Sequence, residues 1–419
     1  MASAAPMGVA LRGYLAAAQA LPLLAPALMR RRLARGKEDP ARWREKLGAA
    51  TAPRPDGPLI WLHAVGLGEV LALRGLIGEM AAQAPEAAFL VTSTARSSAR
   101  VMAANLPPRT RHQFLPLDAP QYVARFLDHW RPCLSVWAEQ EIWPAAVVAA
   151  HARGIPLALI NARITAESHA RRARVRRVYA DLLARFALVS AQDPGTAERL
   201  GDLGARQVVV GGSLKPAAPP LAVEAADLAM VQAALAGRAV WAAASTHPGD
   251  EAEALAAAAA LPDRLLILIP RDIGRADALA ADLAARGLPH VRRSKGALPG
   301  PDTRVWLADS YGELGLWYRL ATAALVGGGF DAIGGHNPWE PAALGAAILH
   351  GPDVRNFATD YARLSQAEAA RALAPGELAT ALRDPGLCAM ATRARALVEA
   401  ARGSLHPLAR DLLALADLP

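Results

Sequence analysis

Acidic side chains follow several apolar runs of this chain, and their type and position suit proton transfer. Glu69 comes after the run 59–65 and a glycine turn, in the first turn of an expected helix. The positive end of a helix dipole favours an ionised carboxylate, which is the form that a general base needs. A first-turn glutamate that only complements the dipole is the alternative interpretation.

A second pair of carboxylates, Glu139 and Glu141, follows the apolar run 134–136 between Trp137 and Trp143. In strand geometry the two side chains would point to the same face. Like charges held close together raise at least one pKa, and buried acidic groups need a partner or a role. We therefore favour a site here over a solvated turn.

A glycine-rich loop, 327–335, follows the apolar run 323–326. Glycine can take φ > 0 and lets a backbone approach a ligand closely. We expect Asn337 to cap a helix, with Pro338 at its first position and Glu340 at its third. Such a helix start would point N–H groups at a phosphate, and the carboxylate could bind ribose hydroxyls. The alternative is a capping box that only starts a helix.

Three other loops of the C-terminal half combine an expected strand with polar side chains at its carboxyl end. Ser245 or Thr246 can cap a helix, and His247 is a candidate donor to phosphate or sugar. Arg271 follows the run 265–270, where it could make a bidentate phosphate contact. Glu313 is expected in the first turn of another helix.

Lysine is rare in this chain, which makes Lys215 after the glycine pair 211–212 notable, although an ordinary surface lysine is the alternative. The chain has only two cysteines, Cys133 and Cys388, far apart, which predicts a reducing compartment and no disulfide framework. His247 and His336 lack a second ligand at i+4, which disfavours a zinc site.

At 419 residues, the chain can form two domains of ordinary size. From residue 58 onward, apolar runs alternate with Ala/Leu-rich helical stretches, a pattern typical of parallel sheets with crossover helices. We expect an α/β fold with two Rossmann-like domains, 37–215 and 225–419, joined by a proline-containing linker, 216–224. Ligands bind at the carboxyl ends of such strands, so both domains would face a shared cleft.

The N-terminal segment, 1–36, contains an uncharged and mostly apolar stretch, 13–29, followed by Arg30, Arg31 and Arg32. The stretch is short for a spanning helix, which needs ~20 residues. We interpret the segment as a membrane anchor or an interfacial helix, with the main body in the cytoplasm by the positive-inside rule. A buried helix of a soluble domain is the alternative.

The formal charge of +8 suits a nucleic acid, an anionic membrane surface or a phosphorylated substrate. Aromatic residues make up only 5% of the chain and no nucleic-acid module is recognisable, so nucleic acid is disfavoured. The glycine turn before Glu69 lacks the dinucleotide fingerprint, which disfavours an NAD-dependent oxidoreductase. A non-catalytic binder would not need so many carboxylates at strand ends.

In order along the chain, the segments resemble the 3-deoxy-D-manno-octulosonic acid (Kdo) transferase family of lipopolysaccharide synthesis. The resemblance rests on these stretches: 42–48, 63–65 with 68–69, Glu139…Glu141…Trp143-Pro144, Asn161-Ala162-Arg163, 212–215, 245–249, Pro270-Arg271, 312–314, Gly334-Gly335-His336-Asn337-Pro338 with Glu340-Pro341, and 351–352 with 356–357.

The resemblance implies a GT-B glycosyltransferase on the cytoplasmic face of a bacterial inner membrane, with no metal or other cofactor. It implies inverting transfer of Kdo from CMP-Kdo to a lipid A precursor. Glu69 would be the base, and Glu139 and Lys215 would stabilise the transition state. The residues that would hold CMP are Pro270, Arg271, Tyr311, Gly312, Glu313, Asn337, Pro338, Trp339 and Glu340. Further candidates are Arg163, Ser245, Thr246, His247, Gly335 and His336.

The chain departs from the family pattern at several of these loops: at Gly66, at Asp272, at Trp339, at Asp250 and in the loop 92–96. These departures concern donor binding beside Arg271 and the fit of the acceptor. Another nucleotide sugar on the same fold is therefore the alternative function.

Overall fold

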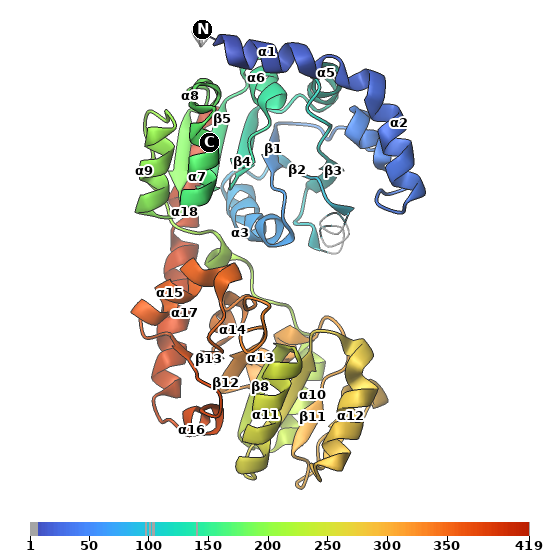
Figure 1. Ribbon diagram of the computed structural model, residues 1–419, viewed down its shortest axis with the longest axis vertical. Helices are drawn as coiled ribbons and strands as arrows, with labels where there is room; N and C mark the ends of the chain where they lie inside the picture. Colours follow the sequence, from blue (N-terminus) through green and yellow to red (C-terminus); the bar gives the residue numbers. More distant parts are fainter. Residues whose placement is uncertain (1–6, 97–98, 100–101, 103–104, 140, 419) are drawn as a thin grey trace. The chain divides into compact units, whose positions relative to one another are not determined.

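A computed structural model describes residues 7–96, 99, 102, 105–139 and 141–418 of the chain, as two compact units (Figure 1). Unit 1 contains the described residues up to Ala218 together with those from Ala401 onward. Unit 2 runs from Pro219 to Ala400. The boundary after Ala218 falls inside the predicted linker, 216–224.

Within the described residues, unit 1 is built on a seven-stranded parallel sheet with the order β3-β2-β1-β4-β5-β6-β7. Its strands are β1 (Leu59–His63), β2 (Ala88–Ser93), β3 (Thr110–Phe114), β4 (Leu134–Ala138), β5 (Leu157–Ala162), β6 (Leu188–Ala191) and β7 (Val209–Val210). The four strands β1, β2, β4 and β5 are buried along their whole length, which is why they read as apolar runs.

Helices cover both faces of this sheet, and alternate side chains of each strand belong to two separate cores. One core joins Trp61 and Leu90 to α5, α6, α8 and α9, and the other joins Leu62 and Val91 to α3 and the C-terminal α18. The helices of unit 1 are α1 (Val9–Ala18), α2 (Leu21–Ala34), α3 (Leu67–Gln83), α5 (Pro120–Trp130), α6 (Pro144–Ala152), α7 (Ala166–Ala173), α8 (Arg176–Leu183), α9 (Pro194–Asp202) and α18 (Leu405–Leu415), with 3-10 turns η1 (Trp43–Leu47) and η2 (Lys215–Ala217).

Unit 2 repeats the scheme with the strand order β10-β11-β9-β8-β12-β13-β14, again parallel throughout its described residues. Its strands are β8 (Val240–Thr246), β9 (Leu265–Pro270), β10 (His290–Arg292), β11 (Val305–Leu307), β12 (Ala323–Val326), β13 (Ala347–His350) and β14 (Ala370–Ala372). Its helices are α10 (Ala225–Leu235), α11 (Pro248–Ala260), α12 (Ala276–Ala285), α13 (Leu314–Leu320), α14 (Trp339–Leu344), α15 (Ala358–Gln366), α16 (Leu378–Leu382) and the first part of α17 (Leu387–Gly403), with turns η3 (Ile273–Arg275), η4 (Arg293–Lys295) and η5 (Arg355–Phe357).

In each sheet the direction of strand addition reverses once, between β1 and β4 in unit 1 and between β8 and β12 in unit 2. Loops at such a reversal diverge and leave room for a ligand at the carboxyl ends of the strands. The loops after these four strands contain most of the predicted site residues.

Two edge strands are absent from the sequence prediction. β3 has the sequence Thr-Arg-His-Gln-Phe, and β14 is only Ala-Arg-Ala. Each lies at the end of its sheet, where one side of the strand pairs with no other strand of the described part of the chain. An edge strand needs no continuous apolar run, so hydrophobicity alone did not find them.

The C-terminal boundary differs from the predicted domain 225–419. The chain leaves unit 2 near the end of α17, and residues from Ala401 belong to unit 1. Leu405, Leu412 and Leu413 of α18 are buried with α3 in the unit 1 core. The sequence predicts the apolar face of α18, but it does not predict which of the two sheets this face covers.

The apolar N-terminal stretch forms two helices, α1 and α2, which meet at Gln19 and Ala20. Leu11, Ala25 and Met29 of these helices are buried within unit 1. The Tyr14 hydroxyl donates to Asp118 at 2.8 Å. Among the described residues, no helix has both the length and the apolar character needed to cross a membrane. Residues 1–6 of the predicted segment 1–36 lie outside the described residues, and its anchor role stays a prediction.

Candidate active site

Glu69 and Glu139 follow the two strands that flank the reversal in the unit 1 sheet. Glu69 occupies the third position of α3, after β1, as predicted. Its Oε2 accepts hydrogen bonds from the backbone N–H groups of Val65, at 3.1 Å, and Gly66, at 3.0 Å. Glu69 thus lies in the first turn of the helix, and these bonds hold its carboxylate at the carboxyl edge of the sheet.

Glu139 is buried directly after β4, with its backbone in the left-handed region at φ +66°. Burial raises the pKa of Glu139 to about 7, and the adjacent Glu69 carboxylate acts in the same direction through its charge and a hydrogen bond. Lys215 and Arg163 act in the opposite direction. At neutral pH a substantial fraction of Glu139 is therefore protonated.

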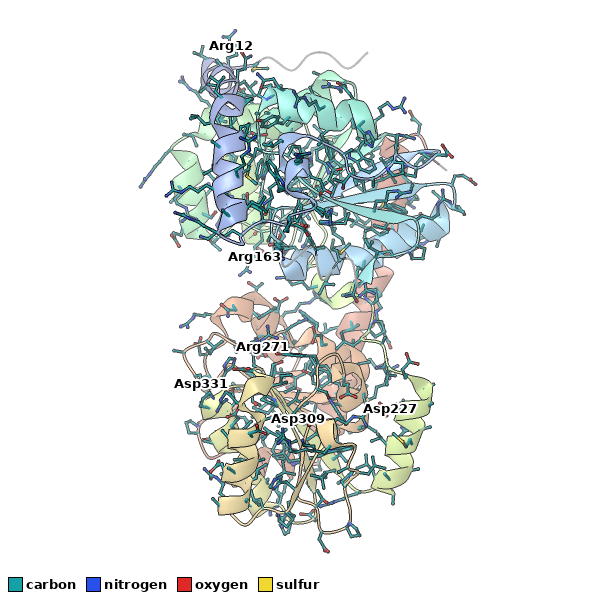
Figure 2. The ribbon with its side chains drawn as sticks, turned by 90° about the vertical axis from the view of Figure 1, so that its right-hand side faces the viewer. Arg12, Arg163, Asp227, Arg271, Asp309 and Asp331 are labelled. Carbon is teal, nitrogen blue, oxygen red and sulfur yellow. The ribbon has the colours of Figure 1, made fainter. Side chains whose placement is uncertain are left out.

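Lys215 and Asn161 complete this cluster from two other loops. The Lys215 Nζ lies 3.9 Å from Glu139 Oε1, and the Asn161 side-chain amide donates to the same oxygen at 3.5 Å. The Asn161 Oδ1 accepts from the Leu214 N–H at 3.0 Å, which fixes the segment that carries Lys215. The structure thus brings the three predicted catalytic residues together. Arg163, which is labelled in Figure 2, is close enough to influence Glu139.

The sequence predicted that Glu139 and Glu141 form a pair of carboxylates, and this prediction was wrong. The strand ends at Ala138, and the positive φ of Glu139 turns the chain, so the two-residue alternation of a strand does not continue. Glu139 is buried, whereas Glu141 is exposed. The carboxylate that approaches Glu139 comes from Glu69, across the pairing of β1 with β4.

In unit 2, two histidines and an arginine meet at the corresponding edge. The Nε2 atoms of His247 and His336 lie 3.1 Å apart with nearly parallel rings, so one nitrogen donates and the other accepts. Burial and, to a smaller extent, the nearby His247 and Arg271 together lower the pKa of His336 to about 4. His336 is therefore neutral at pH 7. The Arg271 N–H donates to the Thr246 carbonyl at 3.0 Å, which connects the loops after β8 and β9.

Several N–H groups of the glycine-rich loop donate hydrogen bonds within the protein. The N–H groups of Gly328 and Phe330 donate to the buried Asp250 carboxylate at 2.6 and 3.2 Å, and that of Gly335 donates to the Gly328 carbonyl at 3.0 Å. Asp331 accepts from the Gly249 N–H at the start of α11, at 3.0 Å. These groups therefore bind the protein itself, and two of the bonds from the loop are accepted by Asp250 in the first turn of α11.

The helix after this loop begins one residue later than expected. Pro338 is the cap of α14, and Asn337 Oδ1 accepts from the Trp339 N–H at 3.1 Å. The Asn337 amide donates to Glu340 Oε1 at 3.2 Å. Burial raises the pKa of Glu340, while Asn337 and the positive charge of Arg271 lower it. Glu340 and Arg271 therefore belong to one electrostatic cluster.

Trp339 is a core residue. Its indole is buried, and its N–H donates to Asp360 at 2.8 Å. The side chain is thus unavailable to a nucleotide, and only the backbone of Trp339 can serve the predicted CMP role.

The segment after β11 is only partly as predicted. Tyr311 is 73% exposed and Gly312 has φ +87°. Glu313 is the cap of α13 instead of a first-turn residue, and its carboxylate pairs with Arg293 at 2.7 Å, which also pairs with Asp227. The Glu313 carboxylate is therefore held in a salt-bridge cluster of unit 2.

The remaining predicted residues lie at the same edge of unit 2. Pro270 ends β9, and Ser245, with φ +56°, forms a bulge before Thr246. The buried Thr246 hydroxyl donates to Glu251 Oε1 at 3.3 Å. Gly335 has φ +73°, and a side chain there would press on Asp353 and Val354. Pro270 and Gly335 thus shape the edge, and the Thr246 hydroxyl is bound within the protein.

Comparisons with known proteins identify the family. Residues 41–218 match the family described as 3-Deoxy-D-manno-octulosonic-acid transferase (kdotransferase). The chain is 37% identical over 368 residues to the 3-deoxy-D-manno-octulosonic acid transferase of Bordetella pertussis, covering 84% of this chain and 85% of that protein. It is 34% identical over 324 residues to the enzyme of that name from Rickettsia felis, covering 76% and 69%. The chain belongs to the Kdo transferase family. It is a glycosyltransferase.

The fold of this Kdo transferase family member is the GT-B architecture, as predicted. A solved UDP-GlcNAc 2-epimerase from Neisseria meningitidis superposes with a TM-score of 0.53 at 11% identity, covering 86% of this chain and 99% of that one. At this identity the likeness concerns the fold alone. That both domains face a shared cleft stays a prediction.

Two residues of this Kdo transferase organise the candidate site although the sequence suggested no site role for either. Asn161, which was named only as part of the family pattern, connects Glu139 to the Lys215 segment, and Asp250, which was named only as a departure from that pattern, fixes the glycine-rich loop. Asn161 is a polar residue near the carboxyl end of the buried strand β5, so its position was a usable signal. Among the described residues, no group of three or more His, Cys, Asp or Glu side chains could hold a metal ion.

Proposed function

We propose that this protein transfers Kdo from CMP-Kdo to a lipid A precursor in lipopolysaccharide synthesis, with inversion and without a metal. The observation that carries the proposal is the Glu69–Glu139 pair beside Lys215 at the reversal of the unit 1 sheet. Membership of the Kdo transferase family supports the donor and the acceptor class.

In the proposed reaction, Glu69 accepts the proton of an acceptor hydroxyl. The acceptor oxygen forms a bond to the anomeric carbon of Kdo from the side opposite the phosphate, and the bond from that carbon to the CMP oxygen breaks. The bonding electrons leave with CMP. Protonated Glu139 keeps a second negative charge away from Glu69, and Lys215 offsets the negative charge that develops.

Unit 2 would hold the nucleotide. Arg271 can bind the phosphate of CMP, because a guanidinium matches the geometry of phosphate oxygens. His247 and His336 lie beside it, and either can offer a ring N–H. Asn337 and Glu340, which bind each other, supply an amide and a carboxylate for the ribose hydroxyls.

The experiment is a transfer assay with protein in detergent, CMP-Kdo generated in situ and a bisphosphorylated lipid A precursor. Mass spectrometry detects each added Kdo, NMR of the product reports the anomeric configuration, and a chelator tests the need for metal. We expect an inverted product and full activity with the chelator. No transfer, a retained configuration or loss of activity with the chelator would contradict the corresponding part of the proposal.

Replacing Glu69 with alanine should lower the transfer rate by roughly 10²–10⁴-fold, the usual contribution of a general base. CMP binding, measured by calorimetry, should remain, because the proposed nucleotide residues belong to unit 2. Unchanged transfer by Glu69→Ala would contradict the assignment of Glu69 as the base. Glu79→Ala, on the solvent side of the same helix, is the matched control.

We further propose that the protein works on the cytoplasmic face of the inner membrane, with α2 on the lipid surface. Leu23, Leu24 and Leu28 of α2 are 82%, 72% and 50% exposed. Arg31 and Arg32 lie in the last turn of the same helix. Exposed leucines beside arginines suit an interfacial helix on an anionic membrane.

Replacing Leu23 and Leu24 with aspartate should weaken binding to vesicles that contain anionic lipid by at least about tenfold. Each leucine that enters the interface contributes on the order of 1 kcal/mol, and the new charges oppose insertion. Vesicle flotation measures the effect. Leu298→Asp, an exposed leucine of unit 2, is the control. Equal binding of the two variants would exclude α2 as the membrane contact.

A further inference from the structure

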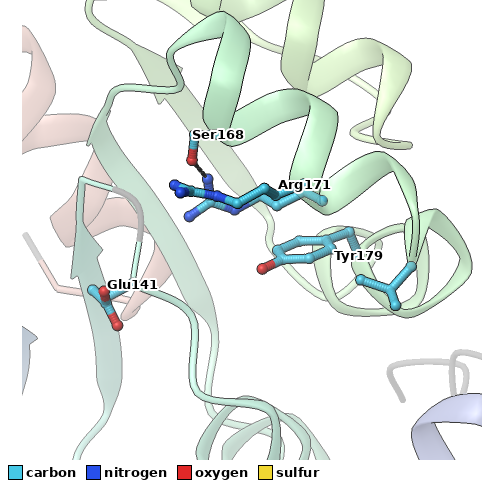
Figure 3. A pocket seen from close by; sticks show the side chains of 6 residues that line it. Glu141, Ser168, Arg171 and Tyr179 are labelled. Carbon is cyan, nitrogen blue, oxygen red and sulfur yellow. Dashed lines mark hydrogen bonds between the residues drawn. The ribbon is translucent and has the colours of Figure 1, made fainter.

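A pocket of about 330 Å³ lies on unit 1 between the helices α7 and α8 and the loop that follows β4. Figure 3 shows Arg171 and Tyr179 extending from the helical side, with Glu141 on the facing loop. The lining residues are Glu141, Ser168, Arg171, Arg172, Val175 and Tyr179. The function proposed above uses none of them.

Two arginines form the basic wall of this pocket. The Arg172 guanidinium is bound by the Ser168 hydroxyl and lies over the Tyr179 ring at 5.5 Å, so its position is fixed in advance. Arg171 pairs with Glu167 at 3.1 Å, and both side chains are mostly exposed. Exposed pairs of this kind are weak, so a phosphate can replace Glu167 as the partner of Arg171.

The other lining residues indicate more than a bare anion. Glu141 would repel a free phosphate, but it can accept hydrogen bonds from sugar hydroxyls. The Tyr179 ring and Val175 offer apolar surface to the face of a sugar ring. The set therefore fits a phosphorylated sugar, in which one ligand carries both the phosphate and the hydroxyls.

Two short connections place the pocket beside the carboxylate cluster. Glu141 is two residues from Glu139, so their Cα atoms are at most about 7 Å apart. On the other side, Arg163 is followed by Thr165, which caps α7 by accepting from the Ser168 N–H at 3.2 Å. A sugar in the pocket can thus belong to the same molecule as the hydroxyl at Glu69.

We propose that this pocket binds a phosphate-bearing sugar of the acceptor glycolipid and so orients the acceptor. The proposal rests on the proposed function and adds the part of unit 1 that recognises the acceptor phosphate. Arg171 and Arg172 bind the phosphate, and Glu141 and Tyr179 contact the sugar.

The test compares Arg171→Gln/Arg172→Gln with Arg177→Gln, which removes a charge from α8 outside the pocket. Each protein is assayed with a bisphosphorylated acceptor and with its monophosphorylated forms. We expect the double variant to raise the KM for the bisphosphorylated acceptor about tenfold or more, with kcat and the KM for CMP-Kdo within about twofold of wild type. It should also lose any preference for the acceptor with both phosphates. Arg171→Gln alone, at an exposed position, should show the same change in weaker form even if the double variant folds poorly.

The proposal is overturned if the double variant behaves like Arg177→Gln, or if it keeps the preference of the wild type for both phosphates. Loss of binding to anionic vesicles with an unchanged acceptor KM would also overturn it, because the arginines would then contact only the lipid surface. If no protein transfers Kdo, the proposed function fails. The pocket is then judged by direct binding of the bisphosphorylated acceptor in detergent, which the double variant should weaken and Arg177→Gln should not.

Discussion

Glu139 combines a buried carboxyl group with a backbone in the left-handed region, two features that each lower the stability of a folded chain. Asn161, at the end of the neighbouring β5, also has a positive φ, at 51°. Both residues have side chains in the carboxylate cluster. Strain of this kind persists where surrounding contacts fix the residue, and it concentrates at functional sites.

The raised pKa of Glu139 makes stability depend on pH. Its pKa rises from an ordinary 4.5 to about 7, so its stabilising effect is complete below pH 4.5 and is lost as the pH rises through about 7. Glu139→Gln removes this titration. The variant should therefore gain stability relative to wild type between pH 5 and pH 8, by about 1–3 kcal/mol.

Urea unfolding at both pH values measures this gain, and Glu399→Gln, at an exposed salt bridge, serves as the control. A stability difference that is the same at pH 5 and pH 8 would mean that Glu139 is ionised throughout this range.

At the scale of the element, the conformation of the glycine-rich loop depends on a residue outside it. The Asp250 carboxylate is fully buried at the start of α11 and accepts from Gly328 and Phe330 in the loop and from the His247 N–H at 3.0 Å. The glycines permit several backbone conformations of the loop, and the hydrogen bonds to Asp250 stabilise one of them. The loop and α11 therefore act as one element that positions His247 against His336.

Asp250→Ala should destabilise unit 2 by about 3 kcal/mol, because it leaves three backbone N–H groups without their charged acceptor. CMP binding should weaken as well, since the His247–His336 pair depends on this loop. Calorimetry measures both effects. Asp282→Ala, in an exposed pair on α12, should change neither. Normal CMP binding by Asp250→Ala would separate the loop from nucleotide recognition.

At the scale of the whole molecule, unit 1 is discontinuous, because the chain enters unit 2 after Ala218 and leaves it before Ala401. Truncation after Gly403 keeps α17 but removes α18 from the core that it shares with α3. Loss of Leu405, Leu412 and Leu413 should destabilise unit 1 by on the order of 5 kcal/mol or more.

Scanning calorimetry of the truncated chain should show an early transition for unit 1 and an unchanged one for unit 2. The full-length chain with Asp417→Asn, a change at the last turn that leaves the core intact, is the control. A truncated chain with the stability of the full chain would show that α18 adds little to unit 1.

The sequence predicted the two sheets well because their central strands are buried on both faces and therefore read as apolar runs. It also placed Glu69 correctly, because a glycine turn and a helix start are local signals. It failed where geometry depends on distant residues. The partner of Glu139 is decided by the pairing of β1 with β4, and the conformation of the loop 327–335 by Asp250. No local pattern carries that information.

The discontinuity of unit 1 has a consequence for synthesis on the ribosome. The segment that completes its core, α18, is made after unit 2, although the sheet that it covers is made before unit 2. Unit 2, from Pro219 to Ala400, can close its own core before α18 emerges. The N-terminal sheet therefore has one face partly uncovered while the second sheet is made, and unit 1 can complete its core only after unit 2 has been synthesised.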